Sequence, residues 1–285
     1  MYFTNWEVLL VDDEPDVLSV SKLAMRDFTV YGLPLRVHTA KSKAETLELL
    51  RSRPEIQFGL AVAFIDVVME SDDAGLELCQ VIREEMGNKL TQLFIRTGQP
   101  GVAPERTVID RYDINGYFTK AEATEDKLYS LVKSGVRQFF WSIYSLGTIT
   151  LLNNVIAVSD SREKIKAQFQ DIRDRFRAGA GREGEPPISA FAMAGDEVLM
   201  QTGWDEQTAK ALVNKLNQLE GTPLSPEGDK SVTDENNHLL IKIAPQPSRA
   251  EFYWLSRNTF TPPDDIISLM HQAYAGLATV WQQAQ

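Results

Sequence analysis

The first 120 residues alternate short apolar runs with segments whose apolar positions recur every three or four residues. The runs at 8–11 and 60–65 are apolar at every position, as expected for strands covered on both faces. Further strands are predicted at 35–39, 90–95 and 117–118, with helical patterns at 17–28, 43–50, 76–82 and 106–112. This alternation predicts a doubly wound α/β domain, in which crossover helices cover both faces of a five-stranded parallel sheet.

From Glu125 the helical spacing continues beyond the point where a compact domain would end. Neither proline nor a turn cluster interrupts it up to about Val158, so we expect one long helix. Its apolar residues near one face are Leu128, Val132, Phe139, Ile143 and Leu146. A helix between two domains has little of its own chain to cover that face, so we predict a homodimer through it. The alternative is a monomer in which the helix folds back onto the domains.

A second domain of α+β class is predicted after the long helix. A helix over 160–179 opens with the capping-box pair Asp160 and Glu163, and a loop rich in glycine and proline follows at 179–187. Strands are predicted at 188–193, 197–201, 238–243 and 251–256, with helices at 208–219 and 264–283. The predicted organisation is a first domain at 1–138, a linker helix at 139–158 and a second domain at 159–285.

Composition narrows the cellular setting and the partners. The chain has 285 residues, 43% hydrophobic and 24% charged, which suits two globular domains. Its one cysteine, Cys79, cannot form an internal disulfide, and the N-terminus lacks the pattern of a signal peptide. The apolar stretch 139–158 is broken by polar residues, so we expect a soluble, cytoplasmic protein without membrane insertion. A net charge of -11 disfavours nucleic acid and favours proteins, small ligands or a metal ion as partners.

Polar residues follow the apolar runs at the point where each predicted strand ends. Asp12 and Asp13 follow the first strand, Asp66 the third, Thr97 the fourth and Lys120 the fifth. Singly, each is explained by a helix cap, a turn or a solvated surface. Together they are informative, because the carboxyl ends of parallel strands meet at one edge of the sheet.

This set of side chains suits phosphoryl transfer. Clustered carboxylates repel one another unless a cation such as Mg²⁺ offsets their charge, and Mg²⁺ prefers oxygen ligands. Lys120 and Thr97 can meet phosphoryl oxygens as a charge and as a hydroxyl donor. Asp66, at the centre, is the predicted nucleophile.

At these residues the sequence closely resembles the receiver family of two-component response regulators. The matching motifs are VLLVDDEPD, FIDVVME, IRTGQPG and GYFTK, and the likeness covers about residues 6–138. Ala121 departs from the family, which commonly has proline after the lysine. The resemblance implies phosphorylation of Asp66 by a histidine kinase or phosphotransfer protein.

The same resemblance implies a role for each matching residue. Asp12 and Asp13 would hold Mg²⁺ together with Asp66 and the backbone carbonyl of Val68. Thr97 would be the switch hydroxyl, Tyr117 the switch aromatic residue and Lys120 the phosphoryl-binding lysine.

Residues 159–285 resemble, less specifically, the GAF-like domains that follow such receivers, often upstream of an HD-GYP phosphodiesterase domain. The absence of cysteine after Cys79 excludes a covalently attached bilin, and His238 and His271 are isolated. We see no pattern of an output enzyme or DNA-binding domain, and therefore expect a regulator that is not an enzyme and signals through protein contacts or dimer rearrangement. One alternative is a small-ligand sensor whose GAF-like domain is modulated by the receiver; another is an enzyme whose site is not apparent. Whether the chain lacks an output domain stays open.

Overall fold

The computed structural model describes residues 4–98, 105–179, 189–245, 251–257 and 262–284. Most of the predicted loop at 179–187, and Ile188, lie outside the described residues. The chain forms two compact units, an N-terminal unit over Phe3–Ile143 and a C-terminal unit that begins at Tyr144. The boundary falls inside one helix, α6 (Glu125–Ile156), so each unit contains part of it.

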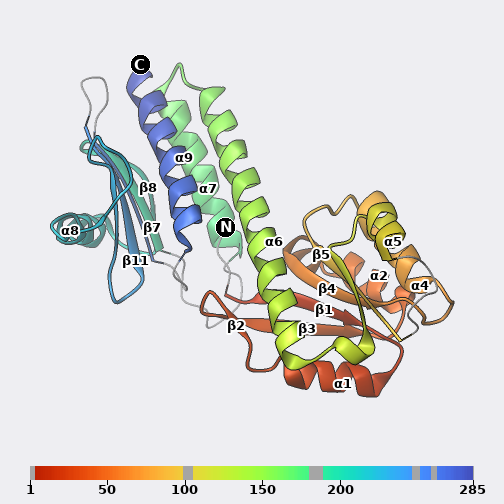
Figure 1. Cartoon of the computed structure of the whole chain (residues 1–285). Helices are drawn as coiled ribbons and strands as arrows, with labels where there is room; N and C mark the ends of the chain where they lie inside the picture. Colours follow the sequence, from red (N-terminus) through yellow and green to blue (C-terminus); the bar gives the residue numbers. More distant parts are fainter. Residues whose placement is uncertain (1–3, 99–104, 180–188, 246–250, 258–261, 285) are drawn as a thin grey trace. The chain divides into compact units, whose positions relative to one another are not determined.

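The N-terminal unit is built on a six-stranded sheet of order β2-β3-β1-β4-β5-β6 (Figure 1). The strands are β1 (Trp6–Val11), β2 (Thr29–Val30), β3 (Leu33–Ala40), β4 (Leu60–Asp66), β5 (Gln92–Thr97) and β6 (Gly116–Thr119). Five of them run parallel, as expected, but β2 adds a short antiparallel edge strand to the predicted five. Tyr31 and Gly32 both have positive φ, 51° and 78°, and form a two-residue turn that folds β2 back onto β3.

Helices cover both faces of this sheet; Figure 1 shows α1 on one side and α2, α4 and α5 on the other. Their bounds are α1 Pro15–Ala24, α2 Lys43–Ser52, α3 Pro54–Gly59, α4 Ala74–Gln80 with a π-helical turn at Val81–Glu85, and α5 Glu105–Tyr112; a 3₁₀ turn, Lys120–Glu122, precedes α6. Strand residues alternate between the faces. Ile65 and Ile95 belong to the core beneath α2, α4 and α5, whereas Phe64, Phe94 and Phe118 pack together on the opposite face.

The apolar face predicted for the long helix is largely covered by its own chain. Leu128, Val132 and Phe139 are at most 1% exposed and Ile143 is 8% exposed. The backbone at Gly135 packs closely on the sheet, since an added Cβ would lie 2.8 Å from Val62 Cγ2. The prediction that a second copy covers this face is therefore wrong for these four residues.

Other apolar residues of α6 are exposed. Leu146, Ile149 and Ile156 are 52–55% exposed. By length and composition alone, α6 is also long and apolar enough to cross a membrane, contrary to the expectation that no segment is.

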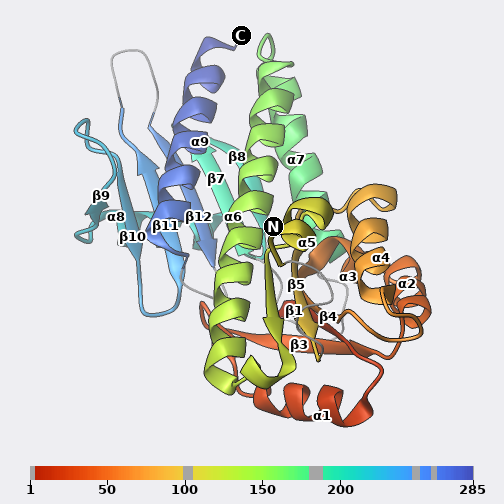
Figure 2. The ribbon, with the colours of Figure 1, turned by 45° about the vertical axis from the view of Figure 1, so that its right-hand side comes forward.

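The C-terminal unit has a six-stranded antiparallel sheet of order β8-β7-β12-β11-β10-β9, and Figure 2 shows the strands following one another in this order. They are β7 (Ser189–Ala194), β8 (Glu197–Thr202), β9 (Thr222–Pro223), β10 (Lys230–Thr233), β11 (His238–Ile243) and β12 (Phe252–Arg257). The antiparallel sheet was expected, but β9 and β10 were not. Both are short, and their sequences TP and KSVT carry little apolar alternation.

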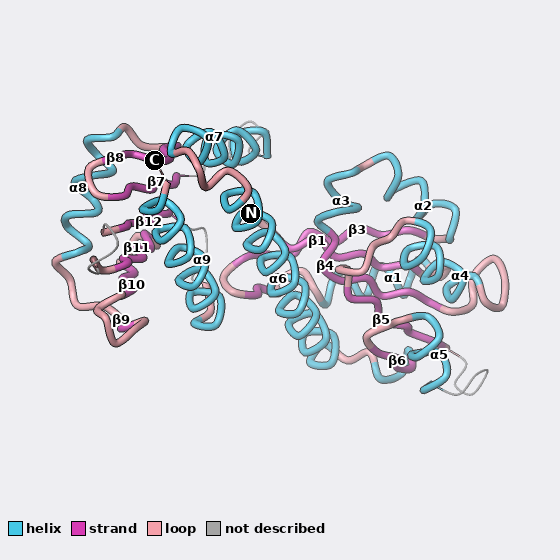
Figure 3. Tube along the Cα trace, turned by 90° about the horizontal axis from the view of Figure 1, so that it is seen from above, coloured by secondary structure: helices cyan, strands magenta, loops and turns pink. Residues whose placement is uncertain are grey.

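Helices pack on both faces of this second sheet as well; Figure 3 shows its strands between α8 (Glu206–Asn217) and α9 (Asp264–Gln283). Leu240 and Leu255 share a core cluster with Val213 of α8. On the opposite face Trp254 stacks on Tyr274 of α9, with ring centroids 4.6 Å apart. A further helix, α7 (Arg162–Gly179), contacts β8.

Candidate functional site

The strand ends of the N-terminal unit bring the predicted side chains to one edge of the sheet. Asp12 directly follows β1, Asp66 and Thr97 end β4 and β5, and Lys120 directly follows β6. Asp12, Asp66 and Thr97 are buried, with at most 3% exposed. Lys120 Nζ lies 2.7 Å from Asp66 Oδ2 and 3.1 Å from both carboxylate oxygens of Asp12. One ammonium group therefore joins two carboxylates that are 54 residues apart in sequence (66 minus 12).

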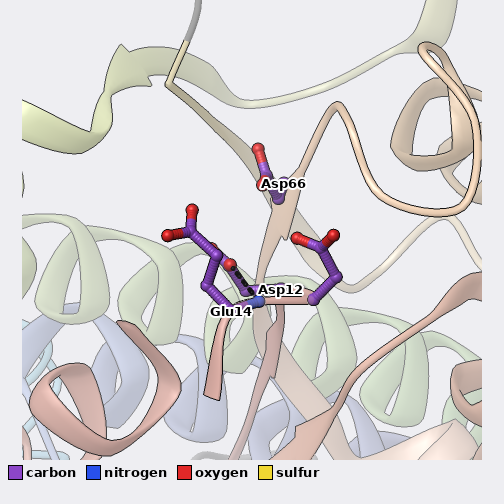
Figure 4. Close-up of side chains that lie close together, drawn as sticks. Asp12, Glu14 and Asp66 are labelled. Carbon is purple, nitrogen blue, oxygen red and sulfur yellow. Dashed lines mark hydrogen bonds between the residues drawn. The ribbon is translucent and has the colours of Figure 1, made fainter. Parts of the chain in front are cut away.

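Four carboxylates form an acidic cluster at this edge: Asp12, Asp13, Glu14 and Asp66 each offer an oxygen, and these oxygens lie within 4.8 Å of one another. Figure 4 shows Asp12 and Glu14 beside Asp66, with the Glu14 amide donating to Asp12 Oδ1 at 3.0 Å. Glu14 was not predicted as a site residue, although its position directly after the acidic pair is a signal for it. Its carboxylate accepts from Lys120 at 2.6 Å.

The acidic cluster fits a hard divalent cation. Its donors are carboxylate oxygens, the ligands that Mg²⁺ prefers. Asp66 Oδ1 is buried and has no hydrogen-bond partner, which is costly unless another group satisfies it. Val68, whose backbone carbonyl was predicted as a further ligand, lies half-buried on the loop directly after β4.

The electrostatics of the site follow from burial and from Lys120. Burial raises the pKa of Asp66 above its usual value, and the nearby charge of Asp12 raises it further, while Lys120 opposes both. Burial alone would lower the pKa of Lys120, but its hydrogen bonds to Asp66, Glu14 and Asp12 raise that pKa above its usual value. The hydrogen bond from Lys120 lowers the pKa of Glu14. Lys120 is thus held as a cation, whereas the ionised form of Asp66 is disfavoured.

The loop after β4 is fixed by a close approach of glycine. Gly75, near the start of α4, donates its amide to Val67 O at 3.0 Å. A Cβ added to Gly75 would lie 1.8 Å from the carbonyl oxygen of Asp66, so only glycine fits here without a backbone shift. Tyr117 is half-buried and lines, with Val67 and Val108, a hollow of about 430 Å³ beside this loop.

A buried arginine, which the sequence did not predict as part of the site, lies beneath the acidic cluster. Arg96, next to Thr97 on β5, is 1% exposed. Its Nη2 donates to Asp12 Oδ2 at 2.9 Å and its Nη1 donates to Ser21 Oγ of α1 at 2.7 Å. A charged residue on the strand directly after the apolar run Leu93–Ile95 was the available signal.

The fold and this edge define an α/β unit with an acidic, lysine-containing site at the carboxyl ends of its parallel strands. Solved structures similar to the chain over about half its length are response-regulator receiver domains. One is the receiver domain of an HD-domain protein from Pseudomonas fluorescens Pf-5 (20% identity, 50% of this chain, 94% of that chain, TM-score 0.41). Another is the phosphorylated cyanobacterial phytochrome response regulator RcpA (20% identity, 49% of this chain, 96% of that chain, TM-score 0.37). A third is the Mn²⁺-bound form of response regulator Rcp1 (15% identity, 45% of this chain, 89% of that chain, TM-score 0.36).

Among curated proteins, the chain is similar to the 3'3'-cGAMP-specific phosphodiesterase 2 of Vibrio cholerae serotype O1 (strain ATCC 39315 / El Tor Inaba N16961). The two share 40% identity over 134 residues, which is 47% of this chain and 25% of that protein. The expectation that the protein is not an enzyme is corrected by this finding, because a relative that shares 40% identity over 134 residues is a phosphodiesterase. No protein-family model matches the chain. The GAF-like assignment of residues 159–285 is therefore not confirmed.

Proposed function

We propose that the N-terminal unit is a phosphoacceptor receiver, which takes a phosphoryl group on Asp66 from a histidine kinase or phosphotransfer protein of a two-component system. One observation carries the proposal: Asp66 presents a buried, unpartnered Oδ1 while its Oδ2 is held 2.7 Å from Lys120 Nζ. Asp66 is thereby oriented at the strand end with one oxygen available as a nucleophile.

The neighbouring residues have complementary roles in this proposal. Asp12, Asp13, Asp66 and the carbonyl of Val68 would hold Mg²⁺, which when bound offsets the charge of the transferring phosphoryl group. Lys120 would leave the carboxylates to pair with a phosphoryl oxygen, since its ammonium is already beside Asp66. Thr97 would donate its hydroxyl to another phosphoryl oxygen, and Tyr117, beside the hollow, would respond to the movement of Thr97.

Labelling with a small phosphodonor tests the proposal. With MgCl₂ present, we expect one phosphoryl group per chain, lost in Asp66→Asn, which keeps the shape but removes the nucleophile. Asp27→Asn is the matched control, because Asp27 is an exposed aspartate whose hydrogen bonds are to Arg26. Intact-mass measurement of the three proteins decides it, and labelling of Asp66→Asn to the wild-type extent would exclude Asp66 as the acceptor.

We further propose that phosphorylation of this receiver regulates a phosphodiesterase output that acts on a cyclic dinucleotide. The support is the 40% identity to the Vibrio cholerae enzyme over 134 residues. The measurement is hydrolysis of 3'3'-cGAMP by the protein with and without phosphodonor. A rate that changes on phosphorylation in the wild type but not in Asp66→Asn supports it, and equal rates contradict it.

A second candidate function is small-ligand sensing by the C-terminal unit, which we propose as a GAF-like domain following a linker at 139–158. A hollow of about 380 Å³ beside the edge strand β8 supports this, because its lining combines apolar residues of that strand with the polar or aromatic residues Gln170, Gln201, Thr202 and Trp204. Titration of nucleotides against the protein, followed by tryptophan fluorescence, tests it. Loss of binding in Trp204→Ala with retention in Trp141→Ala would localise the ligand to this hollow.

A further inference from the structure

The buried guanidinium of Arg96 is a feature of the N-terminal unit that the proposed chemistry does not use. Arg96 lies on the sheet face of Phe64 and Phe94, which α1 and α6 cover, and its side chain reaches past β4 to Asp12 at the end of β1. A fully buried charge is expensive even when paired, and Arg96 Nε has no hydrogen-bond partner. An arginine that stabilised the fold alone would be a poor choice for this position.

Lys120 and Arg96 contact Asp12 from differently accessible positions. Lys120 is about 19% exposed and shares its ammonium among three carboxylates, so an incoming ion can displace it. Arg96 is enclosed and is anchored at its other nitrogen by Ser21, so it stays in place. Asp12 Oδ1 accepts from Glu14 N and Lys120, while Oδ2 also accepts from Arg96.

We propose that Arg96 is a resident cation of the acidic cluster, a positioning residue that holds the Asp12 carboxylate when no metal is bound and lowers the affinity of the cluster for Mg²⁺. This inference rests on the proposed receiver function and adds a residue that sets its metal dependence. A fixed positive charge that shares a carboxylate with a divalent cation repels that cation at short range, where the surrounding protein screens poorly. Arg96 and Mg²⁺ thus offset the same negative charge on Asp12, so the presence of one reduces the stabilisation that the other provides.

The test compares Mg²⁺ binding in three variants of the full chain, using MgCl₂ alone. Arg96→Met removes the charge and keeps an unbranched side chain, Arg96→Lys keeps the charge, and Ser21→Ala removes the anchor without changing the charge. We expect Arg96→Met to bind Mg²⁺ roughly tenfold more tightly than the wild type. This change corresponds to a small part of the repulsion energy between Mg²⁺ and a guanidinium group that share one carboxylate. The Mg²⁺ affinities of Arg96→Lys and Ser21→Ala should stay within about threefold of the wild-type affinity, because the contribution of a single interaction usually varies by about this much with its surroundings. Titration calorimetry and the Mg²⁺-dependent shift in melting temperature supply the readouts.

Unchanged or weaker Mg²⁺ binding by a folded Arg96→Met would overturn the proposal. If Arg96→Met is unfolded without metal, refolding on addition of MgCl₂ supports it, because the ion then replaces the lost charge. A chain that stays unfolded at every MgCl₂ concentration overturns it. Failure here is separable from failure of the receiver function: labelling of Asp66 in the wild type tests the latter, and Mg²⁺ affinity tests Arg96.

Discussion

At the scale of single residues, the site places Asp66 where its charge is costly. Burial and the neighbouring Asp12 raise its pKa, although Lys120 lies 2.7 Å away. A raised pKa in the folded state means that the protonated form stabilises the fold. This contribution is complete below the unfolded-state pKa and is lost as the pH rises through the folded-state pKa. At neutral pH without metal, the ionised Asp66 therefore lowers the free energy of unfolding.

Asp66→Asn should accordingly stabilise the metal-free protein at neutral pH and raise its melting temperature. The difference should shrink as the pH falls, since wild-type Asp66 then becomes neutral too. Excess MgCl₂ should reverse it, because Mg²⁺ stabilises only the protein that keeps this ligand. Thermal unfolding across pH, with Asp27→Asn as control, gives the comparison. A metal-free Asp66→Asn that melts below the wild type at neutral pH contradicts the expected cost of the charge.

Gly75 gives a second test at this scale. Because an added Cβ would meet the carbonyl oxygen of Asp66 at 1.8 Å, Gly75→Ala must shift the loop after β4 or the start of α4. We expect a loss of about 1–3 kcal/mol in unfolding free energy, as for other forced overpacking, together with reduced labelling of Asp66. Gly59→Ala is the matched control, since the nearest atom to its added Cβ, Glu7 Cγ, lies at an ordinary 3.9 Å. Equal stability of the two variants would show that the loop yields easily.

The sequence predicted that several polar side chains lie at one edge of the sheet, and it did so where these residues follow a general rule. Asp12, Asp66, Thr97 and Lys120 stand directly at or after strand ends, where a doubly wound sheet gathers its polar groups. The rule did not predict Arg96, because its side chain runs across the sheet beneath a neighbouring strand to reach Asp12. Such a contact depends on three-dimensional distances that no local pattern records.

At the scale of elements, α6 shows that sequence periodicity predicts the extent and the buried face of a helix but not what covers that face. Its extent, Glu125–Ile156, matches the predicted long helix within two residues at its end. The spacing of Phe139 and Ile143 correctly indicated a buried face, but spacing does not say what covers it; here the N-terminal unit does. The short strands β2, β9 and β10 were missed because two to four residues carry too little periodic signal.

Phe139 should consequently be a stability residue, not an interface residue. It is fully buried within the N-terminal unit, so Phe139→Ala should lower the free energy of unfolding by about 3–5 kcal/mol. Thr150→Ala, an exposed position on the same helix, should change it by less than about 0.5 kcal/mol. Urea unfolding of both variants measures this. A loss below about 1 kcal/mol for Phe139→Ala would mean that the contact is looser than its burial indicates.

At the scale of the whole molecule, α6 belongs to both units, and its second half keeps an exposed apolar stripe of Leu146, Ile149 and Ile156. Residues 138–159 contain no charged side chain, so two copies of the stripe can meet without repulsion between like charges. We propose that the protein forms a homodimer through this stripe, which shares only Leu146 with the face first predicted. In a dimer with two-fold symmetry the same surface of each copy forms the interface, so one stripe per chain is enough to form it.

Ile149→Glu tests the dimer, because it places a charge opposite its own copy and should weaken association at least tenfold, roughly 1.4 kcal/mol. Asn154→Glu adds the same charge at an exposed position on another side of the helix and should leave association unchanged. Light scattering over a range of concentrations, with and without phosphodonor, reports the mass and any effect of Asp66 phosphorylation. A wild type that is monomeric throughout contradicts the dimer, and partition of the wild type, but not of Ile149→Glu, into lipid vesicles would assign the stripe to a membrane surface instead.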